Sequence, residues 1–230
     1  MLSFLSRSIL IVAFANVLVL CSANPHSHQR YSIMSSFNIK AAPGTDIWRK
    51  PPTTDVYNAP THAPAGTKTT APLSKFKSAQ VSFTFKPTEQ YDQGGVVLSF
   101  TPPEGQGNST SPKKWVKSGV EMLNGTPLLG TVATDRWADW SISPVALKPD
   151  GKTVDATIFL QKEGDENGVS LWVYGVGADG VKKTLREICW VFADDMKDWE
   201  LKVEVYAARP KGSTEELDVE FGGLEVTWSE

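Results

Sequence analysis

Cysteine and histidine are scarce in this 230-residue chain, which contains two cysteines and three histidines. Cys21 lies in the apolar N-terminal stretch, so Cys189 has no partner in the rest of the chain and no disulfide framework is expected. In the run ICWVF we expect Cys189 to be a small buried residue rather than a nucleophile. His26, His28 and His62 do not have zinc-ligand spacing, and no nucleotide-binding glycine loop is present, so we predict no metal and no cofactor.

Basic clusters and long apolar runs are also lacking. The formal net charge is −3, so the sequence gives no reason to expect a nucleic-acid partner. The longest apolar run, Ile9–Leu20, has 12 residues, too few to span a bilayer as a helix. With Arg7 before it and Cys21-Ser22-Ala23 after it, this run is typical of a secretory signal over residues 1–23. A second start at Met34 is the alternative, and it predicts a cytoplasmic protein instead of an extracellular one.

Two asparagine sequons are compatible with secretion. Asn108 lies in a polar loop and is the predicted glycosylation site, whereas Asn124 begins a tight turn. Residues 24–35 are polar, and we expect them to be disordered.

The rest of the chain, residues 36–230, consists of short alternating segments separated by turns. Such segments recur about every ten residues, and no long helical pattern interrupts them. The fold class predicted is therefore all-β: a single domain built as an antiparallel sandwich or barrel. Six prolines between residues 43 and 72 indicate that the Pro/Thr-rich stretch 51–72 is an extended loop without ladder pairing.

The stretch 113–144 carries the clearest pattern. Residues 115–122 alternate, so that Trp115, Lys117 and Glu121 share one face while the other face is mostly apolar. Asn124-Gly125 is the dipeptide that best fits a two-residue hairpin turn, and residues 128–133 then form the return strand.

Four motifs occur in an order that resembles a known family: TDIW at 45–48, YDQGGVVL at 91–98, WVKSGVE followed by NG at 115–125, and ADWS at 138–141. The chain is similar to the uncharacterised family that contains the "regulation of enolase" protein, placed in the concanavalin-A-like lectin/glucanase superfamily. The resemblance implies that the fold is a two-sheet antiparallel jelly-roll sandwich with a concave face. It also implies a protein partner in glycolytic regulation. It also implies an intracellular protein, from which residues 1–33 of this chain depart.

Within these motifs, polar and aromatic residues suggest a ligand site on the concave sheet. Gln93, Lys117 and Glu121 would hydrogen-bond a hydroxylated ligand, such as a glycan or a small metabolite, and Trp115 or Trp140 would stack on it. The alternative is structural: Lys117 and Glu121 would be satisfied by neighbouring strands, and the tryptophans would fill the core. The predicted ligand-binding residues are Gln93, Trp115, Lys117, Glu121, Asp139 and Trp140. The function expected from them is that of a non-catalytic binding or regulatory protein.

A catalytic alternative rests on Glu216, Asp218 and Glu220. They resemble the ExDxE strand of laminarinase- and lichenase-type glycosidases, in which they would be nucleophile, helper and acid/base of a β-glucan hydrolase. Their period of two puts all three on one face, but Glu216 and Glu220 lie about 13 Å apart along a strand. A retaining pair of carboxyl groups needs about 5–5.5 Å. Catalysis also requires these acids to line a cleft rather than face solvent.

Overall fold

The computed structural model describes residues 36–104, 112–212 and 214–230. The expected signal, the polar segment 24–35 and Asn108 lie outside the described residues. Residues 34–230 make up one compact unit. Within the described ranges, no helix is long and apolar enough to cross a membrane.

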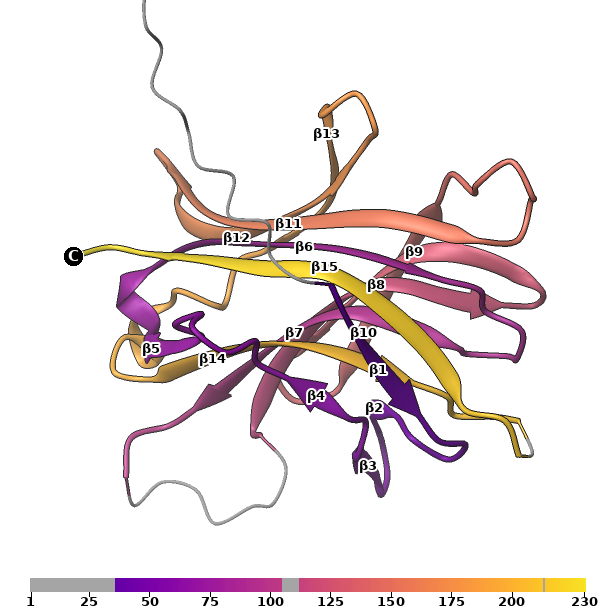
Figure 1. Ribbon diagram of the computed structural model, residues 1–230. Helices are drawn as coiled ribbons and strands as arrows, with labels where there is room; N and C mark the ends of the chain where they lie inside the picture. Colours follow the sequence, from indigo (N-terminus) through magenta and orange to yellow (C-terminus); the bar gives the residue numbers. More distant parts are fainter. Residues whose placement is uncertain (1–35, 105–111, 213) are drawn as a thin grey trace, which may run out of the picture. The chain divides into compact units, whose positions relative to one another are not determined.

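The described chain forms two antiparallel sheets and a separate two-stranded ribbon (Figure 1). The six-stranded sheet has the order β1 (Phe37–Ala41), β15 (Leu217–Trp228), β6 (Phe76–Phe85), β11 (Val154–Asp165), β12 (Gly168–Val176) and β13 (Lys182–Ile188). The seven-stranded sheet has the order β10 (Ala138–Pro144), β9 (Thr126–Thr134), β8 (Lys114–Leu123), β7 (Gln93–Thr101), β14 (Glu200–Ala208) and β4 (Thr61–His62), with β5 (Thr70–Pro72) also paired to β14. The ribbon consists of β2 (Ile47–Lys50) and β3 (Thr54–Tyr57). Two short 3-10 turns, Leu73–Lys75 and Asp194–Met196, complete the described elements. The predicted all-β sandwich is confirmed.

The main core lies between the two sheets, because alternate residues of each strand face inward. Strand β6 contributes Val81, Phe83 and Phe85, which are at most 3% exposed. Opposite them, the inward residues of β7 and β14 belong to the same apolar cluster. The outward residues of the two sheets therefore decide what the domain presents to other molecules.

The hairpin between β8 and β9 turns at Asn124-Gly125, as predicted. Asn124 has φ = 50° and Gly125 has φ = 78°, and such positive angles are those required by the tight turn that matches the strand twist. The register then pairs Lys117 with Val132 and Glu121 with Leu128.

The Pro/Thr-rich stretch 51–72 is not the unpaired loop that was expected. It contains β3, β4 and β5, of which β3 pairs with β2 and the other two pair with β14. The prediction was wrong because strands of two to four residues fit between the prolines, and Pro72 occupies the last position of its strand.

Cys189 also differs from expectation, since its side chain is exposed. Strand β13 ends at Ile188, and the chain then turns. The buried neighbours are Ile188 and Val191, so the turn directs the intervening Cys189 outward. A strand pattern cannot predict the direction of a side chain beyond the end of the strand.

Candidate functional site

The outer face of the seven-stranded sheet, on the side away from the six-stranded sheet, carries a second apolar cluster. Its buried members come from the ribbon and from four strands of the sheet, namely Ile47, Val97, Trp115, Val132 and Tyr206. Partly buried aromatic side chains of the ribbon and of β10 pack against them. The β2–β3 ribbon therefore covers part of this face (Figure 1).

A row of three glycines crosses the same face. Gly95 of β7, Gly119 of β8 and Gly130 of β9 lie opposite one another in register. A Cβ atom on Gly95 would lie 2.2 Å from the Ser118 carbonyl oxygen, and one on Gly119 would lie 2.1 Å from the Gly94 carbonyl oxygen. Only glycine fits these two positions, and the floor of the sheet has no side chains along the row.

Two polar side chains meet across this bare row. Lys117 pairs with Val97, which lies four residues after Gln93 in β7. The backbones of Lys117 and Gln93 are therefore about 13 Å apart along the strand direction. Yet Lys117 Nζ donates a hydrogen bond to Gln93 Oε1 at 2.5 Å, and Gln93 Nε2 donates one to Asp46 Oδ1 at 3.1 Å. Asp46 Oδ1 is 3.8 Å from Lys117 Nζ. Lys117 is 2% exposed, so its ammonium group is almost wholly withdrawn from water.

Glu121 and Tyr206 complete the group that we call the Lys117 cluster, which consists of Asp46, Gln93, Lys117, Glu121 and Tyr206. Burial raises the pKa of the Glu121 carboxyl; the charge of Lys117 opposes this shift and that of Asp46 adds to it. Burial also raises the pKa of Tyr206 well above its ordinary value, with further contributions from Glu121 and Asp46. The cluster thus places two carboxyl groups, a phenol and an amide around one cation.

Aromatic rings flank the cluster. Trp48 and Trp140 meet edge to face, with ring centroids 6.3 Å apart at 81°. Lys117 Nζ lies 6.0 Å from the centre of the Trp48 ring, within the range of a cation–π interaction. Trp140 also packs over the glycine row, because a Cβ atom on Gly130 would lie 3.1 Å from its indole nitrogen.

Two buried polar atoms around the cluster, the indole nitrogens of Trp115 and Trp140, have no hydrogen-bond partner among the described residues. Such atoms cost roughly 1–3 kcal/mol each when they stay unpaired, and a water molecule or a ligand is the usual partner. Burial raises the pKa of Tyr57 to about 12, and a hydrogen bond with Ser99 opposes this shift.

The structure places five of the six predicted ligand residues on this face: Gln93, Trp115, Lys117, Glu121 and Trp140. Trp115 is 0% exposed, so it cannot serve as a stacking platform. Asp139 is adjacent to Trp140 in β10 and points to the opposite face, where its carboxylate forms an ion pair with Arg186 at 2.5 Å. Asp46, Trp48 and Tyr206 were not among the ligand residues predicted from the sequence. The motif at 45–48 contains the first two.

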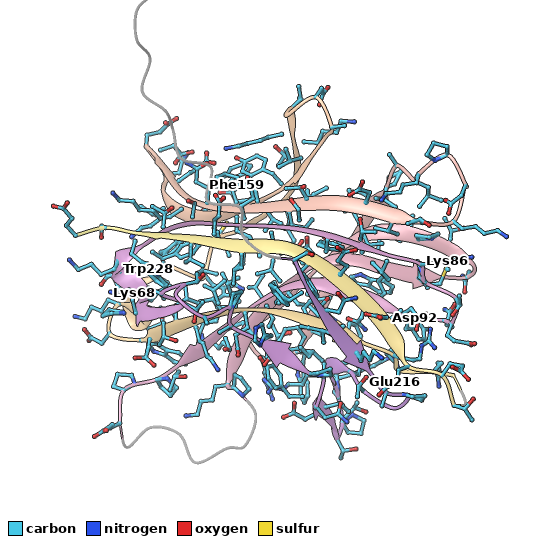
Figure 2. The ribbon with its side chains drawn as sticks, in the orientation of Figure 1. Lys68, Lys86, Asp92, Phe159, Glu216 and Trp228 are labelled. Atoms are coloured by element: carbon cyan, nitrogen blue, oxygen red, sulfur yellow. The ribbon has the colours of Figure 1, made fainter. Side chains whose placement is uncertain are left out.

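Asp92 has a structural role next to this site. Its carboxylate is 0% exposed and accepts two hydrogen bonds, each of 2.8 Å, from Nε and Nη2 of Arg209. It also accepts hydrogen bonds from the backbone N–H groups of Thr88 and Glu89. Arg209 further donates to the Glu215 carbonyl oxygen, which links this loop to the segment that precedes β15, at the end of the domain where Figure 2 labels Asp92 and Glu216. The network fixes the chain immediately before Gln93.

The three acids of the catalytic alternative do not line a cleft. Glu216, Asp218 and Glu220 are exposed, whereas the alternating Leu217, Val219 and Phe221 are buried in the main core. Asp218 accepts a hydrogen bond of 2.7 Å from Asn38 of the neighbouring strand. The acids lie on the outer face of the six-stranded sheet, because β15 directs its apolar residues inward. The geometry expected of a hydrolase is therefore not found there.

Metal ligands do not gather elsewhere in the part of the chain that the structure describes, where no group of three His, Cys, Asp or Glu side chains could hold an ion. A hollow of about 710 Å³ lies away from the Lys117 cluster, between β10 and β13. Another, of about 250 Å³, includes Asp139 and Arg186 in its lining. Neither of these hollows contains a member of the Lys117 cluster.

The fold and the site define a jelly-roll domain with a polar cluster on a partly covered sheet face. The chain belongs to the family described as Protein of unknown function (DUF1349), whose model matches residues 23–228. An uncharacterised protein of Emericella nidulans is 43% identical over 198 residues, covering 84% of this chain and 88% of the relative. The link to the "regulation of enolase" protein stays a prediction.

Two solved structures share the fold at low sequence identity. A functionally unknown protein from Saccharomyces cerevisiae superposes with a TM-score of 0.56 at 18% identity, covering 85% of this chain and 89% of that one. A bifunctional GH43-CE protein of Bacteroides eggerthii superposes with a TM-score of 0.50 at 11% identity, covering 83% of this chain but only 21% of that chain. At these identities the likeness shows the sandwich alone.

Proposed function

We propose that the protein is a non-catalytic binding protein that holds a small hydroxylated ligand, a sugar or a polyol-like metabolite, at the Lys117 cluster. The observation that carries the proposal is the buried Lys117 ammonium group. It has three protons to donate but makes one hydrogen bond among the described residues, to Gln93. A ligand hydroxyl group can accept from Lys117 and at the same time donate to a carboxylate, so it would fit this mixed set of donors and acceptors.

The aromatic neighbours support the same ligand class. Trp48 and Trp140 are half-buried, as is Glu121, so the cluster borders solvent at Glu121, while Lys117 itself is 2% exposed. Sugar rings combine polar edges with apolar faces, and the indole rings offer apolar surface beside the polar groups. Binding without catalysis is supported by the position of Glu216, Asp218 and Glu220 in water on the other sheet.

The test is to screen the full chain against an array of mono- and oligosaccharides and polyols, and to measure hits by calorimetry. Lys117→Met keeps the length of the side chain and removes its charge, and Glu121→Gln keeps the shape and removes the carboxylate. We expect each variant to lose at least about tenfold in affinity, which corresponds to about 1.4 kcal/mol. Glu220→Gln, the same change on the outer face of the other sheet, is the matched control and should bind like wild type.

A different result would make the cluster structural. If Lys117→Met and Glu121→Gln bound every hit as tightly as wild type while their melting temperatures fell, the ligand would lie elsewhere. A wild-type protein that bound no member of the array would also contradict the proposal.

The location of the protein is a separate part of the proposal. We propose that residues 1–23 are removed and that Asn108 carries sugar outside the cell, consistent with the polar, glycan-like ligand. N-terminal sequencing and intact mass of the native protein should show a start near Asn24 with added hexose mass. A start at Met34 or Ser35 without sugar would instead favour a cytoplasmic regulatory role with a protein partner in glycolysis.

A further inference from the structure

The hollow of about 710 Å³ lies where the two sheets meet at one edge of the sandwich, and it is independent of the Lys117 cluster. It is bounded by the chain that follows β10 and by β11, β12 and β13, with Leu129 of β9 on the side of the seven-stranded sheet. Its volume falls within the range of about 300–1,000 Å³ that is usual for small-molecule sites.

Small residues keep this space open. Gly175 of β12 lies close to Leu129 beside the hollow, because a Cβ atom there would lie 3.2 Å from the Leu129 Cδ1 atom and 3.8 Å from the Leu185 methyl groups. Ala156 and Ala178 also line the hollow with little bulk. The core therefore ends in a recess that its own side chains leave unfilled.

Part of the wall of the recess is apolar. Leu129, Val145, Leu147 and Leu185 line it, and all four are only partly buried while they pack against the main core. Apolar surface left in contact with water is unfavourable by about 25 cal/mol per Å², so an apolar ligand gains free energy by covering it.

Charged groups stand among the lining residues. Lys148 forms an ion pair with Asp155 at 3.5 Å, which uses the positive charge of this lysine. Lys183 is exposed and forms no ion pair within the described part of the chain. The recess thus combines apolar surface with one cation, Lys183, that has no ion-pair partner among the described residues. This combination is complementary to a molecule with an apolar body and one anionic end.

We propose that this recess binds a medium-chain alkyl carboxylate, with the alkyl chain against the leucine walls and the carboxylate beside Lys183. The chemistry of both ends is complementary, because the walls remove the chain from water and Lys183 neutralises the head group. Neither the ligand nor the residues are shared with the proposed sugar site.

The experiment is calorimetric titration of the full chain with decanoate and with decan-1-ol at pH 7.5, where the first is charged and the second is not. Wild type should bind both and should prefer decanoate. Lys183→Glu should weaken decanoate binding about tenfold and change decanol binding less than about twofold. The matched control is Lys77→Glu, which makes the same charge reversal at an exposed residue of β6. It should change the affinity for neither ligand.

A second variant tests the recess itself. Ala178 is exposed in the turn after β12, so Ala178→Trp should obstruct the recess without forcing bulk into the core, and should abolish binding of both ligands at an unchanged melting temperature. The proposal is overturned if wild type binds neither ligand at millimolar concentration, or if Ala178→Trp and Lys183→Glu both bind decanoate like wild type.

Discussion

The outer faces of the two sheets carry similar alternating patterns but differ in their surroundings. On β15 the alternation places Asp218 and Glu220 in water above buried apolar neighbours. On β7 and β8 the same alternation places Gln93 and Lys117 on the outer face, yet they are 1% and 2% exposed. The difference comes from the β2–β3 ribbon and its aromatic side chains, which cover part of one face, whereas Asp218 and Glu220 on the other face are exposed.

Strand periodicity therefore determines which residues share a face of the sheet, while a separate segment determines whether the polar residues of that face are buried. Carboxylates in water keep ordinary behaviour and contribute little to stability. A charged group that is buried must be paired, change its protonation state or bind a ligand, since burial of an unpaired charge is costly. Matched changes on the covered and the uncovered parts of the domain should therefore differ in their effects.

The largest effect is expected from Asp92→Ala, which undermines the covered face at the point where β7 begins. The change leaves the Arg209 guanidinium group, 4% exposed, without its carboxylate partner. Breaking a buried pair in this way costs about 3–5 kcal/mol of the free energy of unfolding, measurable by urea denaturation. Asp139→Ala removes the partner of Arg186 where the aspartate side chain is 77% exposed, and should cost at most about 1 kcal/mol. Equal losses in the two variants would contradict the distinction.

A smaller but still large effect is expected from Gly119→Ala in the glycine row. The new Cβ atom would lie 2.1 Å from the Gly94 carbonyl oxygen, so the strands must separate. We expect a loss of about 2–3 kcal/mol in the same denaturation experiment. Gly222→Ala on the six-stranded sheet places its Cβ atom 3.7 Å from Ser82, an ordinary contact, and should change the free energy by less than about 0.5 kcal/mol.

Glu121→Gln should have an effect that depends on pH. Because burial raises the pKa of Glu121 in the folded protein above the ordinary 4.5, folding favours the protonated form. The stability that this proton provides is complete below pH 4.5 and is lost as the pH rises through the raised pKa. The variant has no such loss, so its melting temperature relative to that of wild type should rise between pH 4 and pH 7. A difference that stays flat over this interval would show that the carboxyl group is not effectively buried.

The smallest effects are expected from Glu216→Gln and Glu220→Gln. Both side chains are exposed, so each change should alter the free energy of unfolding by less than about 0.5 kcal/mol. Wild type should release no reducing sugar from laminarin or lichenan. Hydrolysis by wild type that disappeared in Glu220→Gln would show that the uncovered face is catalytic, and would contradict the absence of a catalytic role for these acids.

Much of the fold was predictable from the sequence because its signals are local. Alternation assigned Trp115, Lys117 and Glu121 to one face, and Asn124-Gly125 located a turn whose positive φ angles the structure confirms. The error at Asp139 was avoidable by the same rule, since residues adjacent in a strand point to opposite faces and Trp140 already occupied the outer one.

The rest of the site could not be predicted, because it depends on packing between distant segments. Trp48 meets Trp140, and Asp92 pairs with Arg209, 117 residues further along the chain. No local pattern states that residues 47–57 will cover a sheet face, or that Glu216 and Glu220 will lie on the uncovered one. These outcomes follow from the order of strands in each sheet, which long-range contacts determine.

The short strands in the Pro/Thr-rich stretch have a consequence for association between molecules. Beyond β14, the seven-stranded sheet ends in β4, with two residues, and β5, with three. Pro60, Pro64 and Pro72 flank or end these strands and lack the N–H group that a further strand would need. A row of unpaired backbone groups is the template on which open-ended sheet growth begins, and this edge offers almost none. The prolines therefore protect this edge of the domain against aggregation.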